Sequence, residues 1–556
     1  MTEATSDKTS LDVFFLLYGA AMVFYMQAGF ALLEVGSVSI RNTKNILFKN
    51  LTDITFSTFT FYIFGYGFLY GSGNQFIGTS KFALISGEFE EGDGSEAALD
   101  MQAHNYAKFV YAFAFAATST TIVSGAVAER FNFRAYGVYG ACITSLFYPV
   151  VAHWVWGPDG WASALAPVKS RLFGSGAVDY GGSAVVHVTG GLAALIACVF
   201  VGPRVGRFKR HMVMEMPQQS PVFQTLGTII LWFGWYGFNC VATTQISGGK
   251  SVLAARAAVC TTLSAAVGGA TTMFVDHFMQ RQLEPRRINN GILCGLVSIS
   301  GSAGLIEPHF AVIIGAIASV CYVASSKMLL IFRIDDVVDS VPIHLVGGIW
   351  GLLAPALFVS RRSYVQMYGY PDEDEAKAPC GLFMGCENSG SLLAANVVLL
   401  MAQTLWIIAT CGSVILVLRQ TIGIRIDITQ EVKGIDVQKH GGHSYSEFKT
   451  TVFKFRTASG QEHSMEMRVR AGDAAQFAIA MSEVMEGQEG QVAARTPSGS
   501  SETLHEHASH MSRGIPCPFD KPREDGECGR ANSRGASFDM PFPVYDGHHN
   551  GGGSSG

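Results

Sequence analysis

The chain has little charge for its length. Only 15% of its 556 residues are Asp, Glu, Lys or Arg, well below the roughly 25% of a typical soluble domain. It also lacks a basic stretch and a small-residue cleavage site ahead of its first apolar run, so we expect no cleaved signal peptide. The apolar runs contain no nucleophile and no compact cluster of metal ligands, which argues against an enzyme and against a metal centre.

Long apolar runs dominate instead. Hydrophobic residues make up 49% of the chain, and runs near 20 residues are long enough to cross a hydrocarbon core of about 30 Å. The eleven runs are 11–34, 52–71, 106–128, 134–153, 178–203, 221–243, 252–276, 289–304, 309–331, 338–360 and 393–419. They are continuously apolar rather than alternating, which favours helices over a barrel. We therefore predict an all-α polytopic membrane protein with eleven transmembrane helices.

Basic residues gather in every second connection between these runs. They are Arg41, Lys44 and Lys49, then Arg130 and Arg134, then Arg204, Arg207, Lys209 and Arg210, then Arg281, Arg286 and Arg287, and finally Arg333. Lys and Arg in short loops mark the cytoplasmic side. We therefore expect the N-terminus outside and the C-terminus in the cytoplasm, and we favour the plasma membrane.

Composition divides the chain into five parts. They are a short extracellular N-terminus at 1–10, a membrane domain at 11–421, a polar cytoplasmic segment at 422–446, a small structured element at 447–486 and a disordered tail at 487–556. Within the fourth part, weak alternation at 449–457 and 463–470 predicts a hairpin, and a short helix is expected at 472–486. The last part is rich in Gly, Ser and Pro, which is typical of disorder.

Two histidines lie in apolar runs within the same frame. His187 is followed by Gly190-Gly191 and His344 by Gly347-Gly348, and an acid precedes each, Asp179 and Asp339. Ionisable groups in hydrocarbon are costly and usually face the protein interior or an aqueous path. Two related halves of five helices each would be inverted relative to one another, with the eleventh helix as an addition.

The depths of the two histidines agree with an inverted repeat. At about 1.5 Å per residue, His187 lies roughly 17 Å from the outer end of its run and His344 roughly 10 Å from the inner end of its own. These depths nearly sum to the core thickness of about 30 Å, so the two imidazoles can meet. A single histidine in a span more often bridges two helices, and close packing alone would explain the glycines.

Cys380 and Cys386 share the predicted outer loop before the last run. That side of a membrane is oxidising, so either a disulfide or two free thiols is compatible with the sequence.

Several motifs occur together in a fixed order. They are Gln27–Glu34, Asn45–Leu47, Gly125–Arg130, Asp179–His187, Gly234–Asn239 and Asp339–Gly348. In these motifs the chain resembles the ammonium transporters of the Amt/Mep/Rh superfamily, and among them the Amt branch, over about residues 11–445. The resemblance implies an ammonium-transporter-like fold and a homotrimer with one pore per protomer. It also implies ammonium or ammonia as substrate, with methylammonium as an analogue.

The resemblance further implies roles for individual residues. Substrate binding falls to Trp156 and Tyr111 in an outer vestibule, to Phe115 at the outer gate and to Asp179 as a buried acid beneath the recruitment site. The pore residues are Phe115, Phe238 as the second gate ring, and the twin histidines His187 and His344. We expect Asp339, Gly190 and Gly347 to support them.

Two positions depart from the family pattern. Ala242 stands where a serine is frequent, so Thr243 or a carbonyl would have to replace its hydroxyl. The resemblance makes 11–421 the transport domain and 422–446 the cytoplasmic regulatory segment, and in that segment Gly442 replaces a usual glutamate. These departures and the long tail leave one alternative, an ammonium sensor that signals through its cytoplasmic tail with little conduction. We expect membrane lipid and cytoplasmic regulators as partners, and neither a cofactor nor nucleic acid.

Overall fold

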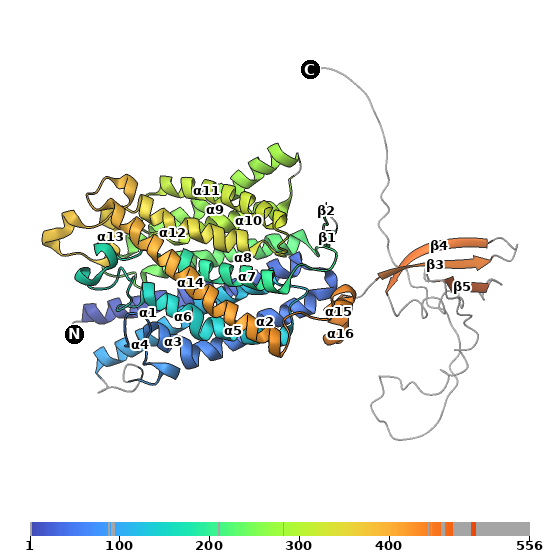
Figure 1. The fold of residues 1–556 in the computed structure, drawn as a ribbon, viewed down its shortest axis with the longest axis horizontal. Helices are drawn as coiled ribbons and strands as arrows, with labels where there is room; N and C mark the ends of the chain where they lie inside the picture. The colour runs from blue at the N-terminus through green and yellow to red at the C-terminus, as the bar shows by residue number, and fades with distance from the viewer. Residues whose placement is uncertain are drawn as a thin grey trace, which may run out of the picture. The chain divides into compact units, whose positions relative to one another are not determined.

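A computed structural model of the chain describes residues 3–86, 89, 95–209, 212–281, 283–442 and 444–445, together with three strands between 448 and 495. The chain forms two units, Met1–Ser446 and Glu447–Gly556, and each is described by itself. The first unit is a bundle of long helices that run roughly alongside one another (Figure 1).

Most of the bundle consists of helices and helical segments of 16 residues or more. The unbroken ones are α1 (Glu3–Ser37), α4 (Glu96–Ala126), α8 (Pro221–Cys240), α9 (Ser251–Gln280), α10 (Pro285–Ser300), α11 (Pro308–Ile331) and α14 (Ser389–Thr421). Four segments contain a π-helical turn: α2 (Thr43–Thr60), η2 (Phe61–Gly65) and α3 (Tyr66–Tyr70); α5 (Phe133–Cys142), η4 (Ile143–Phe147) and α6 (Tyr148–Trp156); η7 (Ser183–Val188) and α7 (Thr189–Val201); η9 (Val341–Val346) and α12 (Gly347–Phe358).

Short elements connect these segments at both ends of the bundle. They are α13 (Arg361–Tyr368), α15 (Ile428–Lys433), α16 (Ile435–Lys439) and the 3₁₀ turns η1 (Ile40–Asn42), η3 (Phe82–Leu84), η5 (Val168–Ser170), η6 (Leu172–Gly174), η8 (Val241–Thr243), η10 (Asp372–Lys377) and η11 (Leu382–Met384). A two-stranded antiparallel ribbon pairs β1 (Phe208–Lys209) with β2 (Met212–Val213).

A helical segment lies at each apolar run of the sequence, so the predicted all-α class is confirmed. Eight of the segments within the described residues are long and apolar enough to cross a membrane. The count of eleven stays a prediction, because α8, α10 and the segment from α2 to α3 are not among those eight. The N-terminal segment predicted at 1–10 is helical from Glu3 onward, because α1 begins there.

Local sequence signals set several helix starts. Proline occupies the first turn of α8, α10 and α11, where its missing N–H costs no hydrogen bond. Ser220 also caps α8, since its hydroxyl accepts a hydrogen bond from the amide of Phe223 at 3.3 Å.

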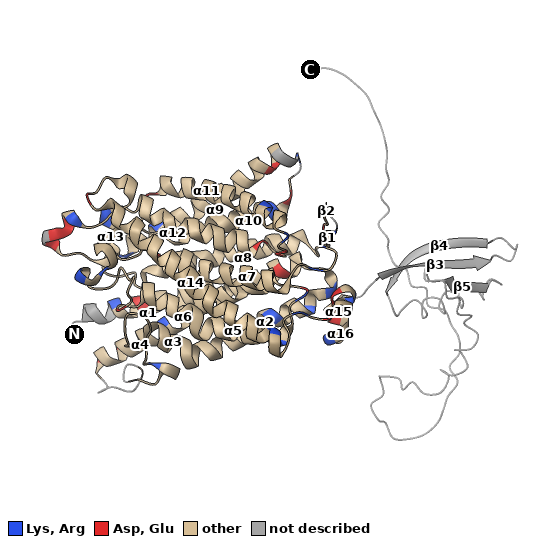
Figure 2. Cartoon of the chain, viewed as in Figure 1, with Lys and Arg blue, Asp and Glu red and all other residues tan. Residues whose placement is uncertain are grey.

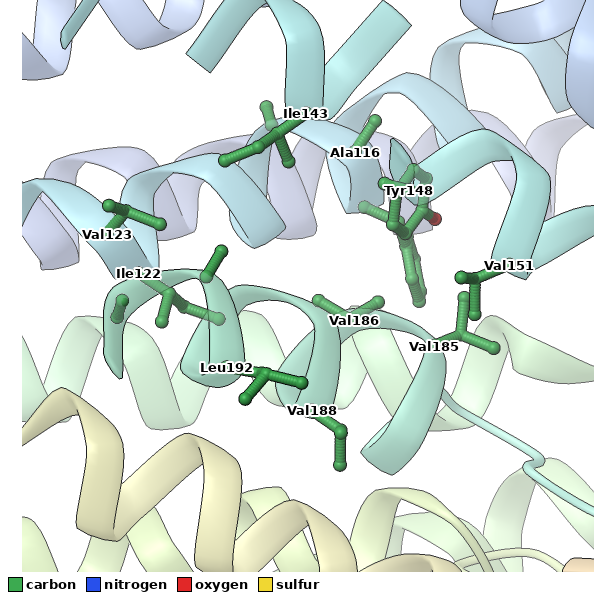
Figure 3. Close-up of a cluster of buried hydrophobic side chains, with 14 of the residues drawn as sticks. Ala116, Ile122, Val123, Ile143, Tyr148, Val151, Val185, Val186, Val188 and Leu192 are labelled. Carbon is green, nitrogen blue, oxygen red and sulfur yellow. The ribbon is translucent and has the colours of Figure 1, made fainter. Parts of the chain in front are cut away.

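Charged residues gather at the two ends of the bundle, and its middle is almost free of them (Figure 2). The middle is packed with aliphatic side chains instead. Figure 3 shows one such cluster, in which Val185 and Val186 of η7 lie near side chains of α4 and of the segment from η4 to α6. This packing fixes the position of the turn that carries His187.

A buried ionic cluster joins three loops at the end of the bundle that holds α15. The Arg204 guanidinium lies 2.8 Å from Asp335 and 2.5 Å from Glu129, and all three side chains are buried. Burial by itself would raise the pKa of Asp335, but the hydrogen bonds and charge of Arg204 outweigh burial and hold that pKa well below its usual range. Burial also acts to raise the pKa of Glu129, but the charge and hydrogen bond of Arg204 outweigh burial and lower that pKa.

The segment from residue 422 to residue 445 docks onto this end. Asp436 accepts hydrogen bonds from the amides of Lys44 and Asn45, both at 2.9 Å, at the start of α2. The Lys44 ammonium donates to the carbonyl of Gly442 at 2.9 Å. Because this bond uses the backbone, the glycine that departs from the family pattern at 442 does not prevent docking.

Cys380 and Cys386 form a disulfide in the loop between α13 and α14, which settles the alternative that the sequence left open.

The second unit contains one described sheet. Strands β3 (Phe448–Arg456), β4 (Glu462–Arg470) and β5 (Gln491–Arg495) are antiparallel in the order β4-β3-β5. β3 and β4 lie where alternation predicts a hairpin. β5 lies within the segment 487–556 and pairs with β3 as an edge strand, and the division of the tail into an ordered and a disordered part stays a prediction. The helix predicted at 472–486 and residues 496–556 lie outside the described residues.

The ionic cluster generates a stability prediction. Asp335→Asn removes the buried carboxylate that accepts from Arg204 and lies 3.4 Å from Arg207, and breaking a buried pair typically costs about 3 kcal/mol or more. We expect a clear drop in the thermal unfolding temperature of the purified protein in detergent. Asp374→Asn, which breaks an exposed pair with Lys377, is the control and should leave that temperature unchanged.

The same cluster predicts a pH dependence. A carboxyl group whose pKa is lower in the folded state stabilises the fold above its unfolded pKa, and that stability is lost as pH falls toward the folded pKa. We therefore expect the difference in unfolding temperature between the parent and Asp335→Asn to be largest near neutral pH and to shrink below about pH 4. A difference that grows on acidification contradicts the assignment.

Candidate functional site

Two π-helical turns carry the twin histidines to the middle of the bundle. His187 lies in η7 and His344 in η9, and each turn continues into an α-helix, α7 or α12. π-helical turns inside helices are rare and often occur at functional sites. The packing is reciprocal, because α7 contacts η9 and α12 contacts η7.

Matched acids hold the starts of both turns. Asp179 accepts hydrogen bonds from the amides of Ala184 and Val185 at 2.9 and 2.8 Å. In the second half, Asp336 accepts from the amide of Val341 at 2.7 Å. Asp336 follows Asp179 by 157 residues (336 − 179), the same spacing that separates the histidines (344 − 187). The pairing of Asp179 with Asp339 made from the sequence is therefore wrong by three residues.

Asp339 has a different place in the frame. It occupies the position of Gly182, and both have a left-handed backbone, with φ of 59° and 91°. Its carboxylate accepts hydrogen bonds from Asn290 and Tyr322 at 3.1 and 3.2 Å and lies 3.3 Å from the Arg286 guanidinium. Asp339 thus ties η9 to α10 and α11.

The two imidazoles meet. Their Nδ1 atoms are 3.1 Å apart, their ring centroids are 5.1 Å apart, and the ring planes differ by 21°. Both side chains are buried, with His187 at 0% exposure and His344 at 4%. A hydrogen bond between two Nδ1 atoms requires one donor and one acceptor, so neutral rings must have opposite tautomers. The Nε2 atom of His187 is buried and has no hydrogen-bond partner within the described part of the chain.

Glycines allow the two turns to approach this closely. A Cβ at Gly191 would meet the backbone nitrogen of Leu345, and one at Gly348 would lie 2.5 Å from the carbonyl of Ser183. Gly190 and Gly347 face other helices, since a Cβ there would lie 2.6 Å from the carbonyl of Ser119 and 2.8 Å from Cys294 Sγ. The absence of a side chain at the first glycine of each pair lets a neighbouring helix pack closely. Its absence at the second glycine lets the other histidine-bearing turn pack closely.

Phenyl rings cover the histidines on one side. Phe115 and Phe238 stack with centroids 4.0 Å apart and planes 19° apart, and both are buried. Phe238 lies 5.5 Å from the ring of His187. Rings at this distance are in van der Waals contact and leave no space between them for a hydrated ion.

Beyond the phenyl rings lies a cavity of about 120 Å³. The Trp156 ring packs edge-on against Phe115 at 5.9 Å, and its indole N–H donates to the carbonyl of Asp179 at 2.9 Å. The Tyr111 hydroxyl donates to the carbonyl of Phe238 at 3.1 Å, so its proton is already used and only its lone pairs remain to accept. Trp156, Tyr111, Phe115 and Asp179 all line this cavity.

Other residues that line the cavity were not predicted from the sequence. They include Tyr70, Tyr148, Tyr180 and Tyr368, the lysines Lys108 and Lys250, and Thr244. Ala242 also lines the cavity, and the threonine beside it is Thr244 rather than the expected Thr243. No periodicity separates such tyrosines from core residues, because the cavity is assembled from several helices and two loops.

Comparison with known proteins agrees with this architecture. The model of the Ammonium Transporter Family matches residues 14–445. Ammonium transporter 1 member 3 of Solanum lycopersicum is 34% identical over 446 residues, covering 78% of this chain and 93% of that protein. Ammonium transporter 3 of Dictyostelium discoideum is 34% identical over 440 residues, covering 78% and 94%.

Solved structures share the fold. A structure described as a sensor Amt protein has a TM-score of 0.67 at 26% identity, covering 78% of this chain and 99% of that one. Candida albicans Mep2 has a TM-score of 0.63 at 24% identity, covering 75% and 86%, and this likeness concerns the fold alone.

The fold and the matches define a multi-pass helical membrane protein of the transporter class. The chain belongs to the ammonium transporter family, in its Amt branch.

The glycine contacts predict a sharp difference between two substitutions. Gly191→Ala would push a methyl group into the backbone of η9, which cannot yield as a side chain can, and such overpacking typically costs about 1–3 kcal/mol. Gly412→Ala in α14 meets nothing within 4 Å and should leave stability unchanged or raise it. Thermal unfolding of both purified variants measures the difference, and equal temperatures would contradict the packing argument.

Proposed function

We propose that the protein conducts ammonium by capturing NH4⁺ in the 120 Å³ cavity and passing NH3 between the phenyl rings and along the histidine pair. One observation carries this proposal, namely an unbroken column of rings. From Trp156 to Phe115, Phe238, His187 and His344, successive centroids are 5.9, 4.0, 5.5 and 5.1 Å apart. The column begins at a cavity and ends at a pair of groups that can exchange a proton.

Capture relies on aromatic faces and oxygen lone pairs. A cation over an aromatic ring gains about 0.5–2 kcal/mol, which replaces part of the hydration shell without a fixed counter-charge that would trap the ion. Trp156 and Tyr111 are both held by hydrogen bonds to backbone carbonyls, so their rings are positioned before substrate arrives. Asp179 supports capture indirectly, because it orients Trp156 and the start of η7.

The stacked pair Phe115 and Phe238 excludes water and hydrated Na⁺ or K⁺. A cation that keeps its hydration shell cannot pass rings in contact, whereas neutral ammonia is small and loses far less solvation energy than an ion in an apolar passage. The gate therefore favours loss of a proton before passage.

The histidine pair gives that proton an acceptor. One imidazole donates through Nδ1 and has a bare Nε2, whereas the other accepts through Nδ1 and has a protonated Nε2. Protonation of the bare Nε2, transfer along the Nδ1–Nδ1 hydrogen bond and release from the other Nε2 would move one proton across both rings. Gly191 and Gly348 allow the two turns to lie side by side, and Asp179 and Asp336 fix where each turn starts, so the turns stay in register for this exchange.

The capture step predicts a change in KM. Trp156→Leu removes one cation–π contact of about 0.5–2 kcal/mol, so we expect KM for methylammonium uptake to rise about twofold to thirtyfold with little change in maximal rate. Trp406→Leu is the control, because Trp406 packs on Phe76 and Trp154 and does not line the cavity. A KM for Trp156→Leu within the error of the control contradicts the assignment.

The relay predicts the effect of removing both imidazoles. The double variant His187→Ala/His344→Ala should take up methylammonium at least about tenfold more slowly or lose its selectivity against K⁺, which corresponds to at least about 1.4 kcal/mol in the barrier. His277→Ala changes an exposed histidine of α9 and serves as the control. If the double variant takes up methylammonium at the parent rate and with the parent selectivity, the proposed proton relay is wrong.

Assembly and orientation follow from the same proposal. We infer a homotrimer in the plasma membrane with the N-terminus outside and the C-terminus in the cytoplasm. The docked segment from 422 to 445 is then available to cytoplasmic regulators, and lipid surrounds the exposed apolar faces of α9 and α14.

A sensor that conducts little is the second candidate. Its support is the similarity to a structure described as a sensor Amt protein, together with Ala242 in the vestibule and the long tail. Rescue of growth of a cell that lacks its own ammonium transporters separates the two candidates. Growth on low ammonium rejects the sensor, and failure to grow with normal surface expression favours it.

A further inference from the structure

Three ionisable side chains near one end of the column have no role in the capture and passage described above. Glu34 of α1 is 2% exposed, and Lys49 and Asp53 of α2 are 0% and 3% exposed. Lys49 was predicted to lie in a loop, but it lies inside α2 and is fully buried. Buried charges are costly unless they are paired or functional.

Glu34 joins three helices. One carboxylate oxygen accepts a hydrogen bond from the Ser124 hydroxyl of α4 at 2.5 Å, and the other accepts from the Asn50 amide of α2 at 2.6 Å. Such bonds hold the carboxylate at a fixed position beside the column. By themselves they would support a purely structural role.

A small cavity gives Glu34 a second role. A cavity of about 10 Å³ is lined by Glu34 and His344 together, with Thr121 and Ser340 as the other polar lining residues. That volume corresponds to about one water molecule, and a water is stable in such a space when it has two to four polar partners. One water can therefore bridge the innermost imidazole of the column and the Glu34 carboxylate.

Lys49 balances the charge of this carboxylate. The two side chains attract each other electrostatically, and Lys49 Nζ has no hydrogen-bond partner within the described residues. Lys49 also lies 5.3 Å from the centre of the Tyr136 ring, whose hydroxyl donates to Asp53 at 2.6 Å. A positive charge on Lys49 favours the anionic form of Glu34, and Asp53 is held by the Tyr136 hydroxyl.

We propose that Glu34 is the proton acceptor on the inner side of the histidine pair. The inference rests on the proposed function. An N–H bond of NH4⁺ breaks, its electron pair stays on nitrogen as NH3, and the proton enters the imidazole pair. The pair releases a proton to the bridging water, the water gives one to the Glu34 carboxylate, and neutral Glu34 forms. Glu34 lies three residues before the end of α1 at Ser37, close to the inner surface, where it releases the proton.

The test is the number of charges moved per substrate in reconstituted proteoliposomes. Current and uptake of labelled methylammonium are measured on the same preparation under an inward gradient. The parent should move about one charge per methylammonium. Glu34→Gln keeps the size of the side chain and its ability to bond Ser124 and Asn50, but it cannot take up a proton. We expect its charge-to-substrate ratio to fall at least tenfold, and Glu34→Asp to restore part of it.

Two further variants separate this role from a structural one. Glu307→Gln makes the same chemical change at a half-exposed carboxylate at the start of α11 and should keep the parent ratio. Ser340→Val adds bulk to the wall of the one-water cavity with Glu34 intact, so it should lower the ratio as Glu34→Gln does. Ser340→Val also serves if Glu34→Gln does not fold.

The outcomes distinguish the inference from the proposed function. If Glu34→Gln or Ser340→Val keeps the parent ratio, or if the parent itself moves no charge, Glu34 is not the acceptor. With any of these results, a loss of methylammonium uptake in the His187→Ala/His344→Ala variant would still support the twin-histidine pathway. If the parent takes up no methylammonium, the proposed function fails first, and the inference fails with it.

Discussion

The contact between two imidazole nitrogens at 3.1 Å constrains the rest of the bundle. It requires two backbone turns from opposite halves of the chain to lie side by side, and this is possible only because Gly191 and Gly348 have no side chain. It also requires each turn to start at a defined point, which the carboxylates of Asp179 and Asp336 provide through backbone amides. The hydrophobic packing of η7 against α4 and α6 then supports the turn that carries His187 (Figure 3).

Much of this site was predictable because it depends on a repeated pattern. The frame of His187 and His344, the glycine pairs and the depth argument all point to a meeting of the two rings, and the structure has that meeting. The gate and vestibule aromatics were assigned from family resemblance alone, and they line one column and one cavity. Helical class followed from the length of the apolar runs, since runs near 20 residues in a chain with little charge have few alternatives.

Other features were missed, and some of them could not be read from the sequence for physical reasons. Asp336 was missed because Asp339 lies closer to His344 in the sequence and was compared with Asp179 instead. The spacing of 157 residues, which the two histidines share, could have identified Asp336. Lys49 was assigned to a loop because it lies between two apolar runs, and only tertiary structure shows that it is buried inside α2 near carboxylates. The vestibule tyrosines and Thr244 come from separate elements, so no local pattern marks them as neighbours.

The hydrogen bond from the Tyr111 hydroxyl to the carbonyl of Phe238 links the cavity to the gate mechanically. The donor ring lines the cavity proposed to receive the ion, and the acceptor carbonyl belongs to Phe238, whose phenyl ring is half of the proposed gate. Any backbone shift that swings that phenyl ring aside must therefore stretch the bond or move the tyrosine with it. If the cavity takes the ion and the phenyl pair is its gate, as proposed, ion binding and gate opening are coupled through this one hydrogen bond.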